Sequence, residues 1–183
     1  MPLIIFCHGV GEGGAATNLW NNGLPLALKQ GFRPPYPCVI IAPQASGGWV
    51  PASWMPQLIK ECYRLYKTDT TATTITGLSA GGSTVWESAL NINQDFAKKI
   101  AALVPLSAYP SNCNRANMPW FKQSKIPVWA IAGGGTGGNE TFFMQGNVEL
   151  VNLVNAQVPN LAKMSIRAGV GHEKFVDVYN FLS

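Results

Sequence analysis

Short, continuous apolar runs alternate along the chain with longer segments in which apolar residues recur every three or four positions. Continuous runs are typical of strands buried on both faces, and the longer spacing is typical of amphipathic helices. The pattern predicts six strands, the last of which alternates apolar and polar residues: Leu3–Cys7, Val39–Ala42, Ala72–Thr76, Ile100–Leu106, Ile126–Ala132 and Leu161–Arg167.

Helical spacing predicts four main helices between and after these strands: Pro51–Lys67, Ala80–Leu90, Phe142–Asn155 and Lys174–Leu182. Regular alternation of strands and helices indicates an α/β fold, with a mostly parallel sheet and helices on both faces. The 183 residues suit a single domain, 1–183. Because the chain is already inside a core strand at Leu3, we expect a segment of the natural fold to precede it.

Composition narrows the class of protein. Hydrophobic residues make up 47% of the chain and charged residues 12%, which excludes a disordered chain. No apolar run approaches the roughly 18 residues that a membrane-spanning helix needs. The net charge of +4 is scattered, and the longest basic run is Lys98-Lys99, which argues against a nucleic-acid partner. Low charge with abundant Asn and Thr favours an extracellular protein.

The four cysteines form no Cys-x-x-Cys pair, so a zinc site of the usual spacing is not expected. Cys7 lies in an apolar strand and is interpreted as a buried thiol. Cys38 and Cys113 could form a disulfide, although nothing in their spacing requires one. No part of the sequence calls for a cofactor or a metal.

The segment Gly77-Leu78-Ser79-Ala80-Gly81 carries the strongest chemical signal. It is a Gly-x-Ser-x-Gly motif between a β-branched strand and a helix, the setting in which a strained turn presents a serine nucleophile. Glycines on either side remove the Cβ atoms that would collide at such a turn. Without catalysis, the motif would be a tight turn with a surface serine. The strand-turn-helix context favours Ser79 as a nucleophile.

Only two histidines are available as a general base. His172 follows the last predicted strand, and the order of catalytic residues on this type of fold is Ser, acid, His. His172 is therefore the predicted base, although a loop histidine that caps the next helix would also fit the position.

The other histidine, His8, follows the first strand and begins a glycine-rich loop. Such a loop supplies one backbone N–H to an oxyanion hole, and the residue after the nucleophile supplies the other. The predicted donors are Val10 and Ala80, with His8 orienting the loop rather than transferring protons. A phosphate-binding loop is a weaker alternative because its lysine is absent.

Together these segments resemble the α/β-hydrolase superfamily. Within it, the chain is similar to the predicted-esterase branch related to dienelactone hydrolases, feruloyl esterases and polyhydroxybutyrate depolymerases. The resemblance implies an α/β-hydrolase fold and hydrolysis of esters, without specifying the substrate. The matching segments are His8-Gly9-Val10-Gly11-Glu12, Gly23-Leu24-Pro25, Val39-Ile40-Ile41-Ala42-Pro43-Gln44, Thr76-Gly77-Leu78-Ser79-Ala80-Gly81-Gly82, Ile126-Pro127-Val128-Trp129-Ala130, Gly171-His172 and Tyr179-Asn180.

The chain departs from this branch in two places. The first two antiparallel strands of the family would lie before Met1. In addition, the family's acidic residue follows the strand at Ile126–Ala132, where this chain has Thr136 instead of Asp. Glu140 is the first carboxylate after that loop and is the candidate acid. A triad without a carboxylate remains open, as does an acid from elsewhere, such as Glu149 in a helix or Asp177 after His172.

Aromatic residues follow the predicted strands at the edge where ligands bind on open α/β sheets. Trp49, Trp54 and Tyr109 are candidates for a substrate pocket, and Trp120 is a weaker one, although each could simply pack beneath a loop. The favoured function is a serine carboxylic-ester hydrolase acting on a small-molecule or polymer-linked ester. The alternatives are a catalytically impaired binding module and a serine peptidase on the same fold.

Overall fold

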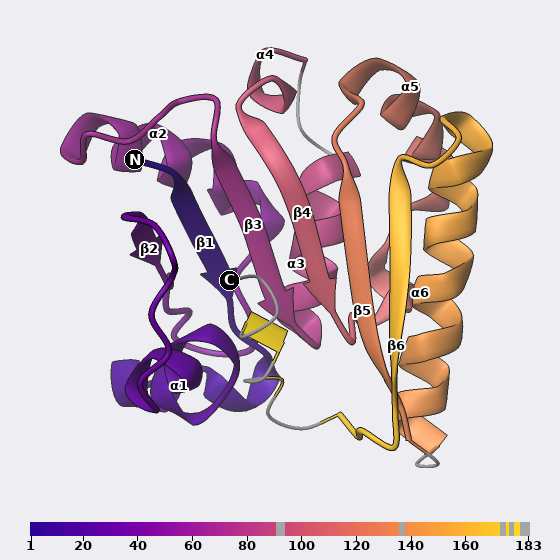
Figure 1. Ribbon diagram of the computed structural model, residues 1–183, viewed down its shortest axis with the longest axis horizontal. Helices are drawn as coiled ribbons and strands as arrows, with labels where there is room; N and C mark the ends of the chain where they lie inside the picture. The colour runs from indigo at the N-terminus through magenta and orange to yellow at the C-terminus, as the bar shows by residue number, and fades with distance from the viewer. Residues whose placement is uncertain (91–93, 136–137, 173–174, 176–177, 180–183) are drawn as a thin grey trace.

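The structure is a computed structural model that describes residues 1–90, 94–135, 138–172, 175 and 178–179. One sheet of six strands runs through it in the order β2-β1-β3-β4-β5-β6, and every neighbouring pair is parallel (Figure 1). All six predicted strands are confirmed, with ends displaced by at most two residues. They are β1 Leu3–Cys7, β2 Val39–Ile41, β3 Thr73–Leu78, β4 Ile100–Leu106, β5 Val128–Gly134 and β6 Ala162–Ala168.

Helix α3 begins and ends at the predicted residues, whereas the segment Pro51–Lys67 divides into a 3-10 turn and α2. Most of the helix expected at Lys174–Leu182 lies outside the described residues. The α-helices are α1 Gly23–Lys29, α2 Met55–Leu65, α3 Ala80–Leu90, α4 Gln94–Ala97, α5 Phe121–Ser124 and α6 Gly138–Gln157. The 3-10 helices are η1 Val10–Glu12, η2 Ala16–Asn21, η3 Ala52–Trp54, η4 Pro110–Asn112 and η5 Arg115–Trp120.

Helix α1 was not predicted, because its start depends on a tertiary contact. Gly23 has a φ of +57°, and a Cβ there would lie 2.5 Å from Cε2 of Phe6 in β1. A glycine therefore allows the helix to begin directly against the first strand. Leu24, Pro25 and Ala27 of this short helix are buried.

The two faces of the sheet are covered unequally (Figure 1). Helices α2, α3 and α6 lie behind the sheet and bury a large core that includes Trp86, Leu103 and Val154. The front face carries α1 over the β1–β2 end and a smaller core that includes Phe6 and Tyr179. The fold is thus an α/β fold with elements on both faces, as predicted.

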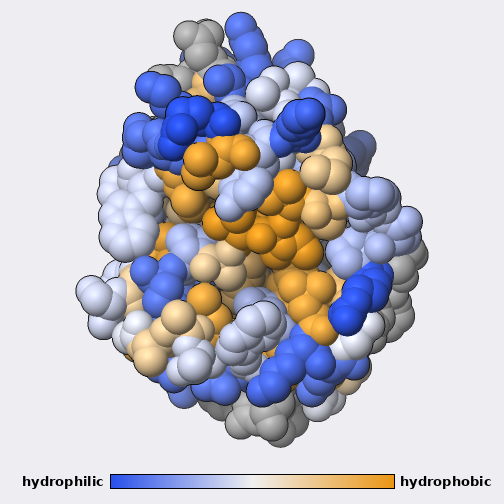
Figure 2. Space-filling view, turned by 90° about the vertical axis from the view of Figure 1, so that its left-hand side faces the viewer, coloured by the Kyte–Doolittle hydropathy of each residue, from blue (hydrophilic) through white to orange (hydrophobic). Residues whose placement is uncertain are grey.

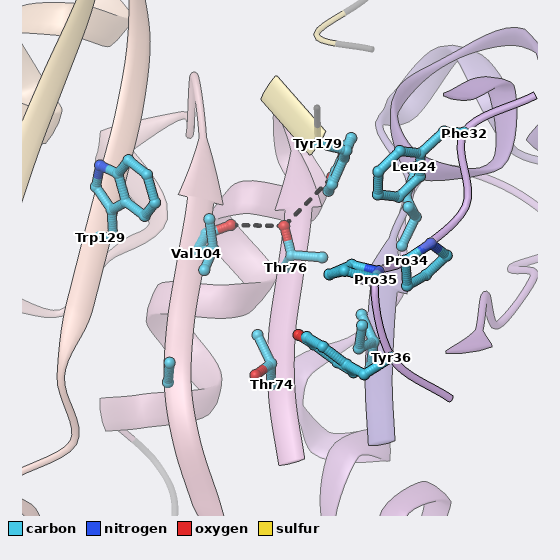
Figure 3. Close-up of a pocket in the computed structure, with 12 residues that line it drawn as sticks. Leu24, Phe32, Pro34, Pro35, Tyr36, Thr74, Thr76, Val104, Trp129 and Tyr179 are labelled. Carbon is cyan, nitrogen blue, oxygen red and sulfur yellow. Dashed lines mark hydrogen bonds between the residues drawn. The ribbon is translucent and has the colours of Figure 1, made fainter. Parts of the chain in front are cut away.

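The thinly covered front face holds an apolar cavity of about 240 Å³ (Figure 3). Thr76 lines it, and its hydroxyl donates to the Val104 carbonyl at 2.8 Å. The Tyr179 hydroxyl lies 3.4 Å from the same Thr76 oxygen, and burial raises the pKa of that phenol. The cavity opens on the flat of the sheet rather than at the carboxyl ends of the strands, so it is separate from the site described below.

Strand β2 occupies one end of the strand order, next to β1 alone. Its three residues are only half-buried. Figure 2 views the molecule from the side on which β2 lies in Figure 1, and hydrophobic residues gather in the middle of that side. With the first two strands of the family missing, the segment Val39–Ala42 was expected at an exposed sheet edge, and the strand order bears this out. Exposed apolar edges invite association, so we predict that copies of the chain associate through β2.

All four cysteines are free thiols, so the disulfide considered between Cys38 and Cys113 is not formed. Cys38 precedes the edge strand β2, whereas Cys113 follows β4, three strands away in the sheet. Burial raises the pKa of both Cys7 and Cys113 to about 12, which keeps these thiols protonated. Within the described part of the chain, no helix has both the length and the apolar character to cross a bilayer.

Candidate active site

The residues singled out by their chemistry follow different strands but meet at one edge of the sheet. His8 follows β1, Ser79 follows β3 and His172 lies beyond β6. Because all strands are parallel, their carboxyl ends lie along the same edge, where open α/β sheets bind ligands. The order of the strands therefore brings these distant segments together.

Ser79 sits in a strained turn between β3 and α3. Its φ is +59°, a left-handed conformation that a non-glycine residue rarely adopts. A Cβ on Gly77 would lie 2.5 Å from the Gly81 carbonyl oxygen, and one on Gly81 would collide with the Cys7 carbonyl. Both glycines are thus required by close backbone packing, as the motif predicted.

The backbone around Ser79 ties this turn to the loop after β4. The Ser79 amide donates to the Leu106 carbonyl at 2.9 Å, and the Tyr109 amide donates to the Ser79 carbonyl at 3.3 Å. Ser79 is half-buried, and among the described residues its hydroxyl forms no hydrogen bond, to His172 or to any other group. The backbone of the turn is therefore held on both sides.

His172 and Glu140 form the central polar contact of the site. The distance between His172 Nδ1 and Glu140 Oε2 is 3.0 Å. The glutamate side chain is 3% exposed, whereas the imidazole is 32% exposed. A carboxylate accepts hydrogen bonds, so the His172 Nδ1–H is the donor in this contact, and Nε2 is the ring nitrogen that remains for other partners.

Two further donors hold the other oxygen of Glu140. The Ser107 hydroxyl donates to Oε1 at 2.7 Å, and the Gly133 amide donates to the same atom at 2.6 Å. Hydrogen bonds to a carboxylate favour its charged form and offset the cost of burial. With three partners on its two oxygens, the carboxylate is fixed in place beside His172.

Glu140 owes its position to the first turn of α6. A negative charge is favourable there because the helix dipole is positive at that end. Of the alternatives, Glu149 lies further along α6 and pairs at the surface with Arg115, at 2.6 and 2.9 Å, which lowers the Glu149 pKa. Thr136 and Asp177 lie outside the described residues.

Ser107 was not identified from the sequence. It directly follows β4, is fully buried and has a φ of +37°. Its amide donates to the Ile131 carbonyl of β5 at 2.8 Å, which fixes the direction of its side chain. A polar residue immediately after a buried strand, at the edge that carries the site, was the signal that could have identified it.

The glycine-rich loop after β1 packs against the Ser79 turn. A Cβ on Gly9 would lie 3.4 Å from the Ser79 Cβ and 3.3 Å from the Leu78 carbonyl oxygen. Val10 begins η1 and is exposed, while Ala80 is the first residue of α3. Amides in the first turn of a helix lack partners within that helix, so both are suited to binding an anion.

His8 is fully buried beneath this loop. Its Nδ1 lies 2.7 Å from the Gly9 carbonyl oxygen, and its Nε2 accepts the Ala45 amide at 3.2 Å. Both ring nitrogens are therefore occupied by backbone groups. This arrangement supports the interpretation of His8 as a residue that orients the loop.

Glu12 also braces the loop, a role that no local pattern in the sequence indicated. Its buried side chain accepts a hydrogen bond from the Asn22 side chain at 2.5 Å, and its backbone carbonyl accepts one from the Gln44 side chain at 2.7 Å. A Cβ on Gly9 would lie 2.9 Å from Glu12 Oε2, so this carboxylate packs directly behind Gly9. The loop is thus held from two neighbouring segments of the chain.

The candidate pocket residues separate into two groups. Tyr109 has ring contacts with Phe142 and Phe143, and Phe143 is stacked on the His172 ring. Trp49 and Trp54 are exposed, and within the described residues neither has a ring contact with His172 or a hydrogen bond to Ser79. Trp120 is partly buried and packs against the core behind the sheet, so its role is in packing. Among the candidates, Tyr109 alone is joined to the site by these contacts.

No family model matches the chain, and no curated protein sequence matches it. Solved structures of esterases share its fold. A thermostable esterase superposes with a TM-score of 0.75 at 20% identity, covering 98% of this chain and 52% of that one. The chain therefore spans about half the length of that esterase.

Two further structures give the same result. SOBER1 from Arabidopsis thaliana has a TM-score of 0.64 at 15% identity, covering 99% of this chain and 95% of that one. A feruloyl esterase module from Clostridium thermocellum, solved with sinapinate, has a TM-score of 0.68 at 16% identity, covering 98% and 74%. At these identities the comparisons establish the fold, an α/β-hydrolase fold found in esterases.

Proposed function

We propose that this chain, with its α/β-hydrolase fold, is a serine carboxylic-ester hydrolase that works through an acyl-enzyme at Ser79. One observation carries the proposal above all. A buried, fully hydrogen-bonded Glu140 contacts His172 Nδ1 at the sheet edge that also holds Ser79 in a strained turn. Ser79 would be the nucleophile, His172 the base and Glu140 the acid, which are the three groups that acyl transfer by a catalytic triad needs.

In the proposed reaction, the Ser79 oxygen attacks the ester carbonyl while His172 Nε2 takes the hydroxyl proton. The carbonyl oxygen becomes negative and accepts hydrogen bonds from the Val10 and Ala80 amides. Collapse of this intermediate breaks the ester C–O bond, and the proton on Nε2 passes to the departing alcohol. Water then attacks the acyl-enzyme by the same route and releases the acid.

Glu140 acts on His172 rather than on the substrate. Its hydrogen bond keeps the proton on Nδ1, so that Nε2 faces the reaction unprotonated, and its charge stabilises the imidazolium formed during attack. The Ser79 hydroxyl has no hydrogen bond to His172 among the described residues, so it has to approach Nε2 when substrate binds. Such catalytic hydrogen bonds are often long or absent in unliganded enzymes.

The binding-module alternative was motivated by the missing Asp in the loop after β5. The contact between Glu140 and His172 supplies a carboxylate in its place, which favours an active hydrolase. A peptidase would use the same residues, so only turnover of amide substrates separates it from an esterase.

The experiment is labelling by a fluorophosphonate probe together with turnover of p-nitrophenyl acetate. In labelling, the Ser79 oxygen forms a bond to phosphorus and fluoride leaves. We expect both signals from the wild-type chain and neither from Ser79→Ala. Ser53→Ala, a change at an exposed serine in η3, is the matched control and should retain both. Labelling or near-full turnover by Ser79→Ala would refute the proposal.

A further inference from the structure

Three aromatic side chains gather beside the proposed base. The Phe143 ring stacks on the His172 ring, with centroids 4.3 Å apart and planes inclined by 27°. Tyr109 lies 5.7 Å from Phe142 and 6.0 Å from Phe143, and the two phenylalanines are 5.9 Å apart. We call Tyr109, Phe142 and Phe143 the aromatic platform.

The platform is exposed where large rings are usually buried. Tyr109 is 39% exposed and Phe142 is 44% exposed, and neither belongs to the two buried cores. A contiguous group of exposed apolar rings, especially one beside polar functional groups, is typical of a binding surface. The position next to His172 indicates that the bound group belongs to the substrate.

Buried polar contacts hold the platform rigid. The Asn147 side chain in α6 donates to the Ala108 carbonyl at 2.8 Å and to the Phe143 carbonyl at 2.7 Å. The Trp86 indole donates to the oxygen of the same Asn147 side chain at 3.0 Å. These bonds tie α6 to the loop that carries Tyr109, so a ligand would find the rings already in place and would lose little affinity in ordering them.

The platform also has a fixed relation to Ser79. The Tyr109 amide donates to the Ser79 carbonyl, and the Tyr109 carbonyl accepts the Ser83 hydroxyl at 2.7 Å. Across the turn, Gly9 and the proposed oxyanion donor Val10 lie on the side of β1, whereas His172 and Phe143 lie on the side of β5 and β6. The platform therefore belongs to the side of the base.

In acyl transfer, the base delivers its proton to the leaving alcohol, so the alcohol part of the ester lies on the side of the base. We propose that the platform binds an aromatic ring in the leaving alcohol, and that the substrates are esters of arylalkyl alcohols. This inference rests on the proposed esterase function and names its substrate class. A ring that meets aromatic partners gains about 3- to 10-fold in affinity beyond its buried area.

The test compares kcat/KM for benzyl acetate and cyclohexylmethyl acetate, whose alcohols are close in size and differ in aromaticity. Both esters form the same acetyl-enzyme, so the ratio of their kcat/KM values reports only the alcohol side. Methyl phenylacetate and methyl cyclohexylacetate form the matched pair for the acyl side. Released acid is followed by titration at constant pH.

For the wild-type chain, we expect kcat/KM for benzyl acetate to exceed kcat/KM for cyclohexylmethyl acetate by about 3- to 10-fold. We call this quotient the benzyl ratio. The two esters of the acyl pair should show no such difference in kcat/KM. Phe142→Leu and Tyr109→Leu should each move the benzyl ratio toward one. Tyr66→Leu is the matched control, because Tyr66 is an exposed aromatic at the opposite end of the sheet, beside the bond from the Met1 amine to the Lys67 carbonyl. This control should keep the wild-type ratio.

The inference is overturned if the wild-type benzyl ratio is one, if the aromatic preference lies in the acyl pair, or if both platform variants keep the wild-type ratio. In those cases the acetates are still hydrolysed and the esterase function stands. Absence of turnover for every ester, together with absence of fluorophosphonate labelling, would instead defeat the proposed function, and the inference with it.

Discussion

The two histidines lie in equivalent positions, each after a strand and at the same edge of one sheet, yet their surroundings differ completely. His8 is fully buried, and backbone groups occupy both of its ring nitrogens. His172 is partly exposed, with one nitrogen on a carboxylate and the ring stacked on Phe143. The comparison shows that a histidine is not suited to act as a base merely because it lies at the functional edge of the sheet. The partners of the ring nitrogens decide which histidine can exchange a proton.

The sharpest test of this contrast is removal of the proposed base. His172→Ala should lower turnover of p-nitrophenyl acetate by about 10⁶-fold, as loss of the base does in a triad that acts as a unit. The double variant with Ser79→Ala should be little worse than either single variant. A loss of less than about 10-fold in His172→Ala would show that the two histidines had been assigned to the wrong roles.

The next effect concerns the carboxylate that distinguishes His172 from His8. Glu140→Gln keeps the size of the side chain but lets its amide present a donor to Nδ1, which disturbs the tautomer. Loss of the acid in a comparable triad costs about 10⁴-fold in turnover. We expect a loss of this order in kcat with KM little changed, measured at substrate saturation. An unchanged kcat would remove Glu140 from the triad and leave Ser79 and His172 in place.

A smaller loss is expected when the buried histidine is changed. His8→Asn removes the bonds to Gly9 and Ala45 that hold the loop carrying Val10. One oxyanion donor is worth about 10²- to 10³-fold, so a displaced loop should cost at most about 10³-fold in kcat. Because His8 acts apart from Glu140, the losses of the two variants should multiply in the double mutant. A loss comparable to that of His172→Ala would contradict the comparison.

The smallest expected effect belongs to Ser107. Ser107→Ala removes one hydrogen bond to the Glu140 carboxylate, while the Gly133 amide still holds the same oxygen. Loss of one bond to a charged group should lower kcat by about 10-fold. Since Ser107 works through Glu140, the change should have little further effect in a Glu140→Gln background. If the losses in kcat of the two single variants multiplied in the double mutant, Ser107 would act independently of Glu140.

Much of the fold could be predicted from local pattern. Each continuous apolar run became a strand, because buried parallel strands are apolar along their whole length. The turn at Ser79 was also predictable, since its Gly-x-Ser-x-Gly motif is read within five residues, although Gly81 is required by the close approach of Cys7 in the neighbouring strand β1. Helix α1 was missed because its start depends on Gly23 meeting Phe6, a contact between segments that are distant in the sequence.

The sequence by itself determined the six strands, the strand-turn-helix motif at Ser79 and the placing of each histidine after a strand, because each of these is read from residues within a few positions of one another. Only the tertiary structure decided which carboxylate meets His172. Glu140 reaches it because α6 begins beside the carboxyl ends of β4 and β5, where Ser107 and Gly133 hold the other carboxylate oxygen. The aromatic platform likewise joins a loop after β4 to a helix after β5. Such meetings depend on the order of strands in the sheet, which local patterns do not encode.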